Sequence, residues 1–120
     1  MTEEAKTQLI EAGVDLKGAM DRFLNNEAMY EKYIKKFILD KNYGELEEAV
    51  AEKDCKKAFV ASHTLKGVCG NLALQGLFQA ICKQVEFFRA ENFDDGAAMM
   101  PEVSEEYNKI ITVIKTAFPE

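Results

Sequence analysis

The chain has 120 residues, of which 48% are hydrophobic and 30% charged, and its formal net charge at pH 7 is −6. This length suits one domain with a single core. Acids and lysines are interleaved, so the sequence predicts no basic face for nucleic acid, and the negative charge favours a soluble monomer. Only 7 glycines and 2 prolines are present, which favours a few long helices.

The cysteines and the chain's first residues indicate a reducing, cytoplasmic setting. Cys55, Cys69 and Cys82 are odd in number and far apart, so they predict neither a disulfide framework nor a zinc site. We expect them to be small buried hydrophobes. The opening residues lack a signal-peptide pattern, and the uncharged stretch 67–82 is shorter than the roughly 20 residues of a membrane span. No membrane association is expected.

Residues 1–24 predict short helices that cap one end of the domain. The opening segment is weakly amphipathic and breaks at Gly13. Asp15 is a suitable N-cap for a short helix through Phe23. Asn26 is then placed to cap the next, longer helix.

Residues 26–118 predict four long amphipathic helices, because apolar residues recur there at steps of three and four. The first begins at Glu27, is bent or interrupted at residues 42–44 and continues towards Lys53. Asp54 caps the second helix, and two more follow. The apolar stripe of the first helix consists of Met29, Tyr30, Tyr33, Ile34, Phe37 and Ile38.

Short connections between long helices make consecutive helices antiparallel neighbours. A turn is expected at residues 91–96. Pro101 fits the first turn of the last helix, where a missing N–H matters least. No segment alternates with a period of two, so strands are not expected. The prediction is one all-α domain over residues 1–120, an up-down antiparallel four-helix bundle with a short N-terminal capping helix.

His63 is the single histidine of the chain, and Gly67 and Gly70 follow it by one and two helical turns. A glycine inside a helix costs about 1 kcal/mol relative to alanine. On a helical wheel the histidine and both glycines lie opposite the apolar stripe that contains Leu65. We therefore expect the imidazole to point into solvent on a face kept clear for a partner. Alternatively, Gly70 has no side chain because a neighbouring helix approaches this helix closely at that position.

The residues around the histidine suggest phosphoryl chemistry. An imidazole in water is mostly neutral at pH 7, so one ring nitrogen is free as a nucleophile. Lys66 lies one turn away, where its ammonium can neutralise a phosphoryl group. Phe59 and Val60, together with Gly67 and Gly70, would form a docking patch for the partner. The sequence contains no metal-binding pattern, P-loop or kinase glycine-rich motif, so no metal or cofactor is expected.

The run of residues 63–72, HTLKGVCGNL, resembles the active-site helix of the histidine-containing phosphotransfer (Hpt) domain family. Weaker agreement covers most of the chain. The resemblance implies that His63 accepts a phosphoryl group from the phospho-aspartate of a receiver domain and passes it to another receiver. Such receivers belong to response regulators or hybrid histidine kinases. Lys66 would sit beside the phosphate. Mg²⁺ and most catalytic groups would belong to the receiver, so the chain would be a carrier and not an enzyme.

Two details of the resemblance concern the following helix and the turn before it. Gln84 or Arg89 would turn back towards the histidine as a second tier of the site. The family usually has glycine where Ala73 stands. If that position is left-handed, alanine costs about 1 kcal/mol; otherwise the turn shifts to Gln75-Gly76.

Other functions remain open on the sequence alone. A non-phosphorylated helical adapter would bind receivers through the same face, but it would not require the His63–Lys66 pair. The chain would alternatively be the phosphoacceptor module cut from a chemotaxis-type or hybrid sensor kinase. Its initial methionine and the absence of a linker favour a free-standing protein of a multistep phosphorelay.

Overall fold

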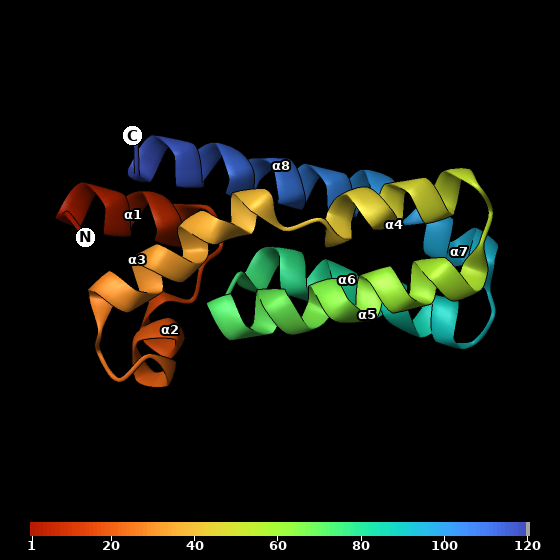
Figure 1. Ribbon diagram of the computed structural model, residues 1–120, viewed down its shortest axis with the longest axis horizontal. Helices are drawn as coiled ribbons and strands as arrows, with labels where there is room; N and C mark the ends of the chain where they lie inside the picture. The colour runs from red at the N-terminus through yellow and green to blue at the C-terminus, as the bar shows by residue number, and fades with distance from the viewer. Residues whose placement is uncertain (120) are drawn as a thin grey trace.

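The computed structural model describes residues 1–119, and it assigns helices but no strand in that range (Figure 1). An isolated bridge joins Val14 to Leu74. The molecule is elongated, with extents of 42 × 25 × 20 Å. The all-α prediction is confirmed for the described residues. Among them, no helix is both long and apolar enough to span a membrane.

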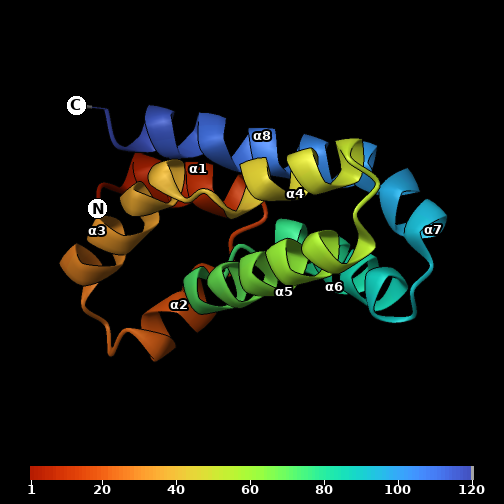
Figure 2. The same ribbon diagram turned by 45° about the vertical axis from the view of Figure 1, so that its right-hand side comes forward.

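Two short helices, α1 (Glu3–Glu11) and α2 (Leu16–Arg22), form the N-terminal cap. Asp15 caps α2 as predicted, because its side chain accepts a hydrogen bond of 3.1 Å from the Gly18 N–H. Helix α1 lies along the last helix, and α2 packs near the end of the bundle (Figures 1 and 2). The predicted capping helix is therefore confirmed, with a second helix preceding it.

The first arm of the bundle is broken in the middle. Its parts are α3 (Glu27–Lys36), a 3₁₀ turn (Phe37–Leu39) and α4 (Asn42–Ala51). Asn26 caps α3 as predicted by accepting from the Met29 N–H at 3.0 Å. The break falls at Asp40 and Lys41, just before the predicted residues 42–44. It is fixed by the Asp40 side chain, which accepts from the Asn42 N–H at 2.9 Å.

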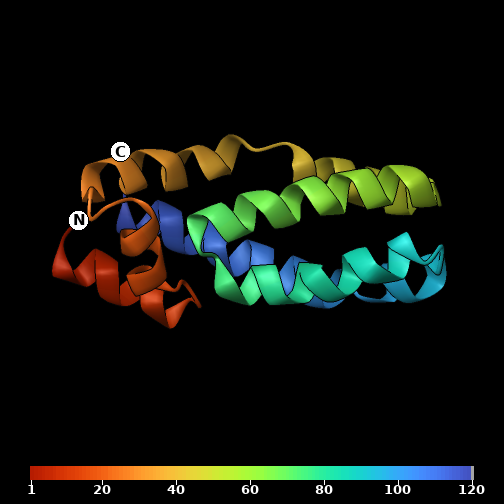
Figure 3. The ribbon, with the colours of Figure 1, turned by 90° about the horizontal axis from the view of Figure 1, so that it is seen from below.

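The other three arms are α5 (Cys55–Leu72), α6 (Gln75–Arg89) and α8 (Met100–Ala117). Helices α5 and α6 run antiparallel side by side, and α8 packs against α6 (Figure 3). The turn predicted at residues 91–96 is instead largely helical. Asn92 accepts from the Asp95 N–H at 3.3 Å and starts a short helix, α7 (Phe93–Ala98). Pro101 lies in the first turn of α8, as predicted.

The turn between α5 and α6 is held by the loop that precedes α2. The Asp15 N–H donates to the Ala73 carbonyl at 2.9 Å, and the Gly76 N–H donates to the Gly13 carbonyl at 3.2 Å. Ala73 is left-handed, with φ of 58°. The alternative in which the turn shifts to Gln75-Gly76 is therefore wrong, because α5 ends at Leu72 and Ala73 makes the turn.

Candidate functional site

Helix α5 presents His63 to solvent. The helix starts at Asp54, whose side chain accepts from the Lys57 N–H at 3.0 Å. Its buried face carries Ala58, Ala61, Ser62, Leu65, Cys69 and Leu72. His63 is exposed on the other side, as the helical wheel predicts. The long amphipathic helix thus holds the imidazole on a rigid scaffold.

The two glycines that follow the histidine differ in their surroundings. A Cβ atom on Gly67 would meet nothing within 4 Å, whereas one on Gly70 would lie 3.2 Å from Cε1 of Phe78. The Gly70 carbonyl also accepts a hydrogen bond from Arg22 of α2. Gly67 therefore leaves open space beside His63. The expectation that Gly70 faces no packed neighbour is wrong, because its missing side chain makes room for Phe78 of α6.

Lys66 is half-buried one turn along the helix from His63. Its ammonium forms no salt bridge with any residue in the range 1–119. The positive charge beside the imidazole is therefore not neutralised by a protein carboxylate. It is available to an anion that reaches the ring.

Aromatic and cationic side chains flank the imidazole on its α6 side. The ring centres of Phe59 and His63 are 5.5 Å apart with an interplanar angle of 34°. Cζ of Arg89 lies 5.0 Å from the centre of the Phe59 ring. Arg89 therefore lies against Phe59, the aromatic neighbour of His63, and its predicted place in a second tier beside the histidine stays a prediction. Val60, 57% exposed, adds an apolar side chain to the same surface of α5.

Gln84, the other second-tier candidate, faces away from the histidine. It is fully buried, and its Nε2 donates to the Gly96 carbonyl at 3.1 Å and to Sδ of Met100 at 3.1 Å. These partners belong to α7 and α8. The prediction for Gln84 is wrong. Gln84 and Arg89 are five residues apart on α6, so their side chains lie on different faces of the helix, and that of Gln84 points into the core of the bundle.

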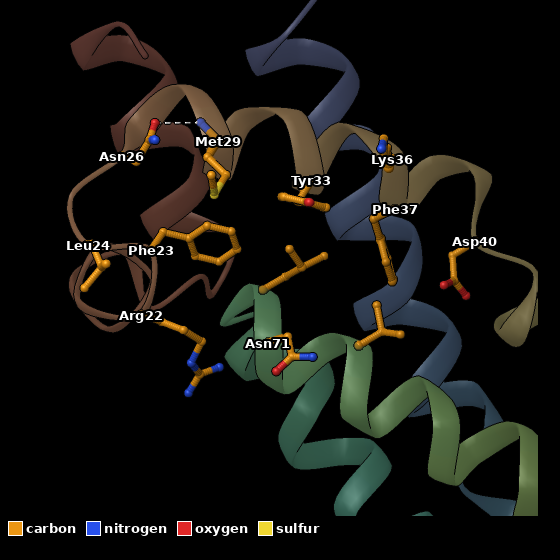
Figure 4. A pocket seen from close by; sticks show the side chains of 12 residues that line it. Arg22, Phe23, Leu24, Asn26, Met29, Tyr33, Lys36, Phe37, Asp40 and Asn71 are labelled. Atoms are coloured by element: carbon orange, nitrogen blue, oxygen red, sulfur yellow. Dashed lines mark hydrogen bonds between the residues drawn. The ribbon is translucent and has the colours of Figure 1, made fainter.

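An apolar groove of about 700 Å³ lies beside the C-terminal half of α5 (Figure 4). Three aromatic side chains point into it: Phe23 from the residue just after α2, Tyr33 from α3 and Phe37 from the 3₁₀ turn. Asn71, one turn after Gly67, lines the opposite side. The α5 residues that line the groove, Val68, Asn71 and Leu72, come one to three helical turns after His63.

This groove was not predicted from the sequence, because the apolar stripe of α3 is typical of residues that pack into a core. Tyr30, Ile34 and Phe37 are indeed buried, but Met29 and Tyr33 are 45% and 44% exposed. Their outward exposure follows from the space left between α2, α3 and α5. The usable signal was Leu24, an apolar residue between the predicted short helix, which runs through Phe23, and the predicted cap at Asn26; it is 86% exposed.

The family model for the Hpt domain matches residues 39–113. This range covers more than half of the chain and includes His63, Lys66, Gly67 and Arg89. The chain belongs to the Hpt domain family. An Hpt domain is a histidine phosphotransfer module of phosphorelay signalling, and the His63 face lies entirely within the matched range. Comparison with curated proteins and comparison with solved structures each returned no match.

The Hpt match begins at residue 39, so it does not include α1, α2 and α3. One wall of the apolar groove is therefore built from residues outside the matched range. The N-terminal cap and the α3 segment lie outside the matched range, whereas His63, Lys66 and Arg89 lie inside it.

The three cysteines of this Hpt domain are free, and one of them is fully buried. Cys69 lies in the core, where burial raises the pKa of its thiol and leaves it protonated. Cys55 and Cys82 are half-buried, so the expectation of burial holds for one of the three. Within residues 1–119, no group of three or more histidine, cysteine or acidic side chains is placed to hold a metal ion.

Proposed function

We propose that His63 is the phosphoacceptor of a multistep phosphorelay, charged by the phospho-aspartate of one receiver domain and discharged to the aspartate of another. The observation that carries this proposal is an exposed imidazole with open space at Gly67 and, at Lys66, an ammonium that forms no salt bridge with residues 1–119. Binding alone would not require this combination. The chain acts as a carrier in this account, and it works in the cytoplasm, where receivers are found.

The transfer step balances without a further reactant. A ring nitrogen of the neutral imidazole attacks phosphorus, and its lone pair forms the N–P bond. The P–O bond to the aspartate breaks, and the carboxylate leaves with the electron pair. The other ring nitrogen keeps its hydrogen, so the ring becomes cationic while the phosphoryl group keeps its charge. Lys66 stabilises the phosphoryl oxygens by a charge-assisted contact.

The receiver supplies Mg²⁺ and the remaining catalytic groups in this proposal. It would dock over Val60 and Gly67 and extend into the apolar groove, because Val68 and Asn71, which line the groove, follow Gly67 on the same helix. Phe59 and Gly70, the other predicted docking residues, are partly covered by Arg89 and Phe78. They would form the edge of the interface and not its centre.

Phosphoryl uptake from a charged receiver tests the proposal. Receivers labelled with a small phosphodonor are mixed with the chain, and the label on the chain is examined for stability in acid and alkali. Wild type is expected to gain an acid-labile, alkali-stable phosphate, and the His63→Gln variant to gain none. Equal labelling of both proteins would show that the site is wrong, and no labelling from any of several receivers would defeat the proposal.

A further inference from the structure

We infer that the apolar groove beside α5 binds a small aromatic monoanion, with its one acidic group at Arg22 and its ring system against the aromatic side chains of the groove. The class of ligand is a carboxylate or a sulfonate on an aromatic body. The site is separate from His63, which does not line the groove. Its occupation therefore does not depend on phosphoryl transfer.

The groove has the size and the lining of a small-molecule site. Its volume is about 700 Å³, within the range of roughly 300 to 1,000 Å³ that is usual for ligand pockets. Phe23, Tyr33 and Phe37 supply aromatic rings. The centres of the Phe23 and Tyr33 rings are 6.0 Å apart, with an interplanar angle of 48°. Because tilted rings offer both faces and edges to a further ring, an aromatic body fits this lining.

Part of the apolar lining is exposed to solvent in the free chain. Leu24, Met29 and Tyr33 are 86%, 45% and 44% exposed, and all three line the groove. A ligand that covers them removes apolar surface from water, which favours binding. The apolar body of the ligand therefore supplies most of its affinity, and its acidic group determines its orientation.

The charges along the groove favour an anion. The whole chain has a formal net charge of −6, yet the charged residues that line the groove are two cations, Arg22 and Lys36, and one anion, Asp40. Neither cation forms a salt bridge within the described range 1–119. The groove is thus a locally positive surface on an acidic molecule, and such a surface attracts ligands of negative charge.

Arg22 is the anchor for the acidic group. Its guanidinium donates to the Gly70 carbonyl, which holds it against the part of α5 where Asn71 also lines the groove. A guanidinium has five N–H donors, so several remain for the paired oxygens of an acidic group. Asp40 lies towards the other end of the groove (Figure 4). Because its carboxylate would repel a second acidic group there, the ligand carries only one.

Two fluorescent probes of similar shape test this site on the full chain. One is 1-anilinonaphthalene-8-sulfonate, an aromatic monoanion, and the other is N-phenyl-1-naphthylamine, which lacks the sulfonate. Both fluoresce more strongly in apolar surroundings, so titration gives a dissociation constant for each. The wild-type chain is expected to bind both probes, and to bind the sulfonate at a single site.

Substitutions separate the aromatic wall from the anchor. Tyr33→Gln removes a ring without changing the charge, and it is expected to weaken both probes equally. Arg22→Gln is expected to weaken the sulfonate about fivefold, the effect of one exposed charge-assisted contact, and to leave the neutral probe unchanged. Arg22→Lys should restore part of that loss. Lys32→Gln, which removes an exposed lysine of α3 outside the groove, is the matched control and should change neither affinity.

The side-chain Nε–H resonances of the arginines locate the acidic group, because Arg22 and Arg89 are the two arginines of the chain. Arg22→Lys assigns the pair of resonances in a ¹H–¹⁵N spectrum by removing one. The sulfonate is expected to shift the Arg22 resonance and to leave the Arg89 resonance in place.

Each part of the site has a result that would overturn it. A wild-type chain that enhances the fluorescence of neither probe, or equal affinities in wild type and Tyr33→Gln, would exclude the groove. A loss of sulfonate affinity in Lys32→Gln as large as that in Arg22→Gln, or an Arg22 resonance that does not move, would exclude Arg22 as the anchor. None of these measurements involves phosphate, so the proposed function of His63 stands or falls separately.

Discussion

At the scale of single residues, Lys66 and Arg89 show what helical spacing reveals and what it does not. The position of Lys66 follows from its own helix, because residues three apart share a face. The position of Arg89 depends on how α6 packs against α5, which no spacing within one helix defines. The sequence therefore proposed Gln84 and Arg89 equally, and packing separates them: Gln84 enters the core, and Arg89 covers Phe59.

Lys66→Ala is expected to slow phosphoryl transfer or shorten phosphohistidine lifetime several-fold, because a charge-assisted contact of this kind is worth about 1 kcal/mol. The half-buried side chain makes no salt bridge to lose, so the helical circular dichroism should not change. Transfer rates and the decay of labelled protein measure the effect. Lys115→Ala, an exposed lysine at the far end of α8, is the control. Wild-type kinetics in both variants would remove the role assigned to Lys66.

Ala73→Gly is expected to stabilise the fold. A left-handed alanine costs about 1 kcal/mol relative to glycine, while losing its buried methyl group costs part of that gain. The net expectation is an increase of about 0.5 kcal/mol in the free energy of unfolding. Urea denaturation measures it, with Ala73→Val as the opposite change. A loss of stability in Ala73→Gly would show that methyl packing outweighs backbone strain.

At the scale of elements, side-chain caps made the helix starts predictable. Asp15, Asn26 and Asp54 each accept a backbone N–H three residues on, and this local chemistry is written in the sequence. Helix α7 was missed because the residues Asp94, Asp95 and Gly96 are typical of turns. It forms because Asn92 caps it, and the buried Gly96 fits against Phe88.

A larger side chain at Gly67 of α5 is expected to change stability and receiver docking in opposite directions. Gly67→Leu is expected to raise the stability of the helix by up to about 0.8 kcal/mol, because the site is open and leucine is the better helix former. The same side chain would fill the approach to His63 and reduce receiver affinity at least tenfold. Titration calorimetry and urea denaturation measure the two effects.

Gly44→Leu is the matched control for this change. Gly44 is also helical, exposed and free of neighbours within 4 Å, but it lies on α4, where it lines a hollow with Ser104 and Asn108 of α8. Its substitution is expected to leave receiver affinity unaltered. If Gly67→Leu binds receivers as tightly as Gly44→Leu, the Gly67 face is not the interface.

At the scale of the whole molecule, the bundle followed from the sequence and the groove did not. Helix order and antiparallel packing follow from long amphipathic segments with short connections. The groove lies between α2, α3 and α5, and it depends on tertiary packing that leaves Met29 and Tyr33 partly uncovered. Periodicity marks such residues as apolar without saying whether the protein itself or a partner covers them.

Met29→Lys tests whether a receiver uses the groove. The residue is 45% exposed, so the substitution is tolerated by the fold, but it places a charge at an apolar contact. Receiver affinity is expected to fall about tenfold, while uptake of phosphate from phosphoramidate is unchanged. Ile10→Lys, at a 57% exposed position on α1, is the control. Equal receiver affinity in the two variants would exclude the groove from the interface.

The central claim is that His63 carries a phosphoryl group between two receivers. The most direct test is a discharge experiment: the phosphorylated chain is purified free of its donor and mixed with a second receiver and Mg²⁺. The account predicts that label leaves the chain and appears on the receiver's aspartate faster than it is released as free phosphate. Label that leaves only as free phosphate, with every receiver tried and at the rate of the chain alone, would contradict it.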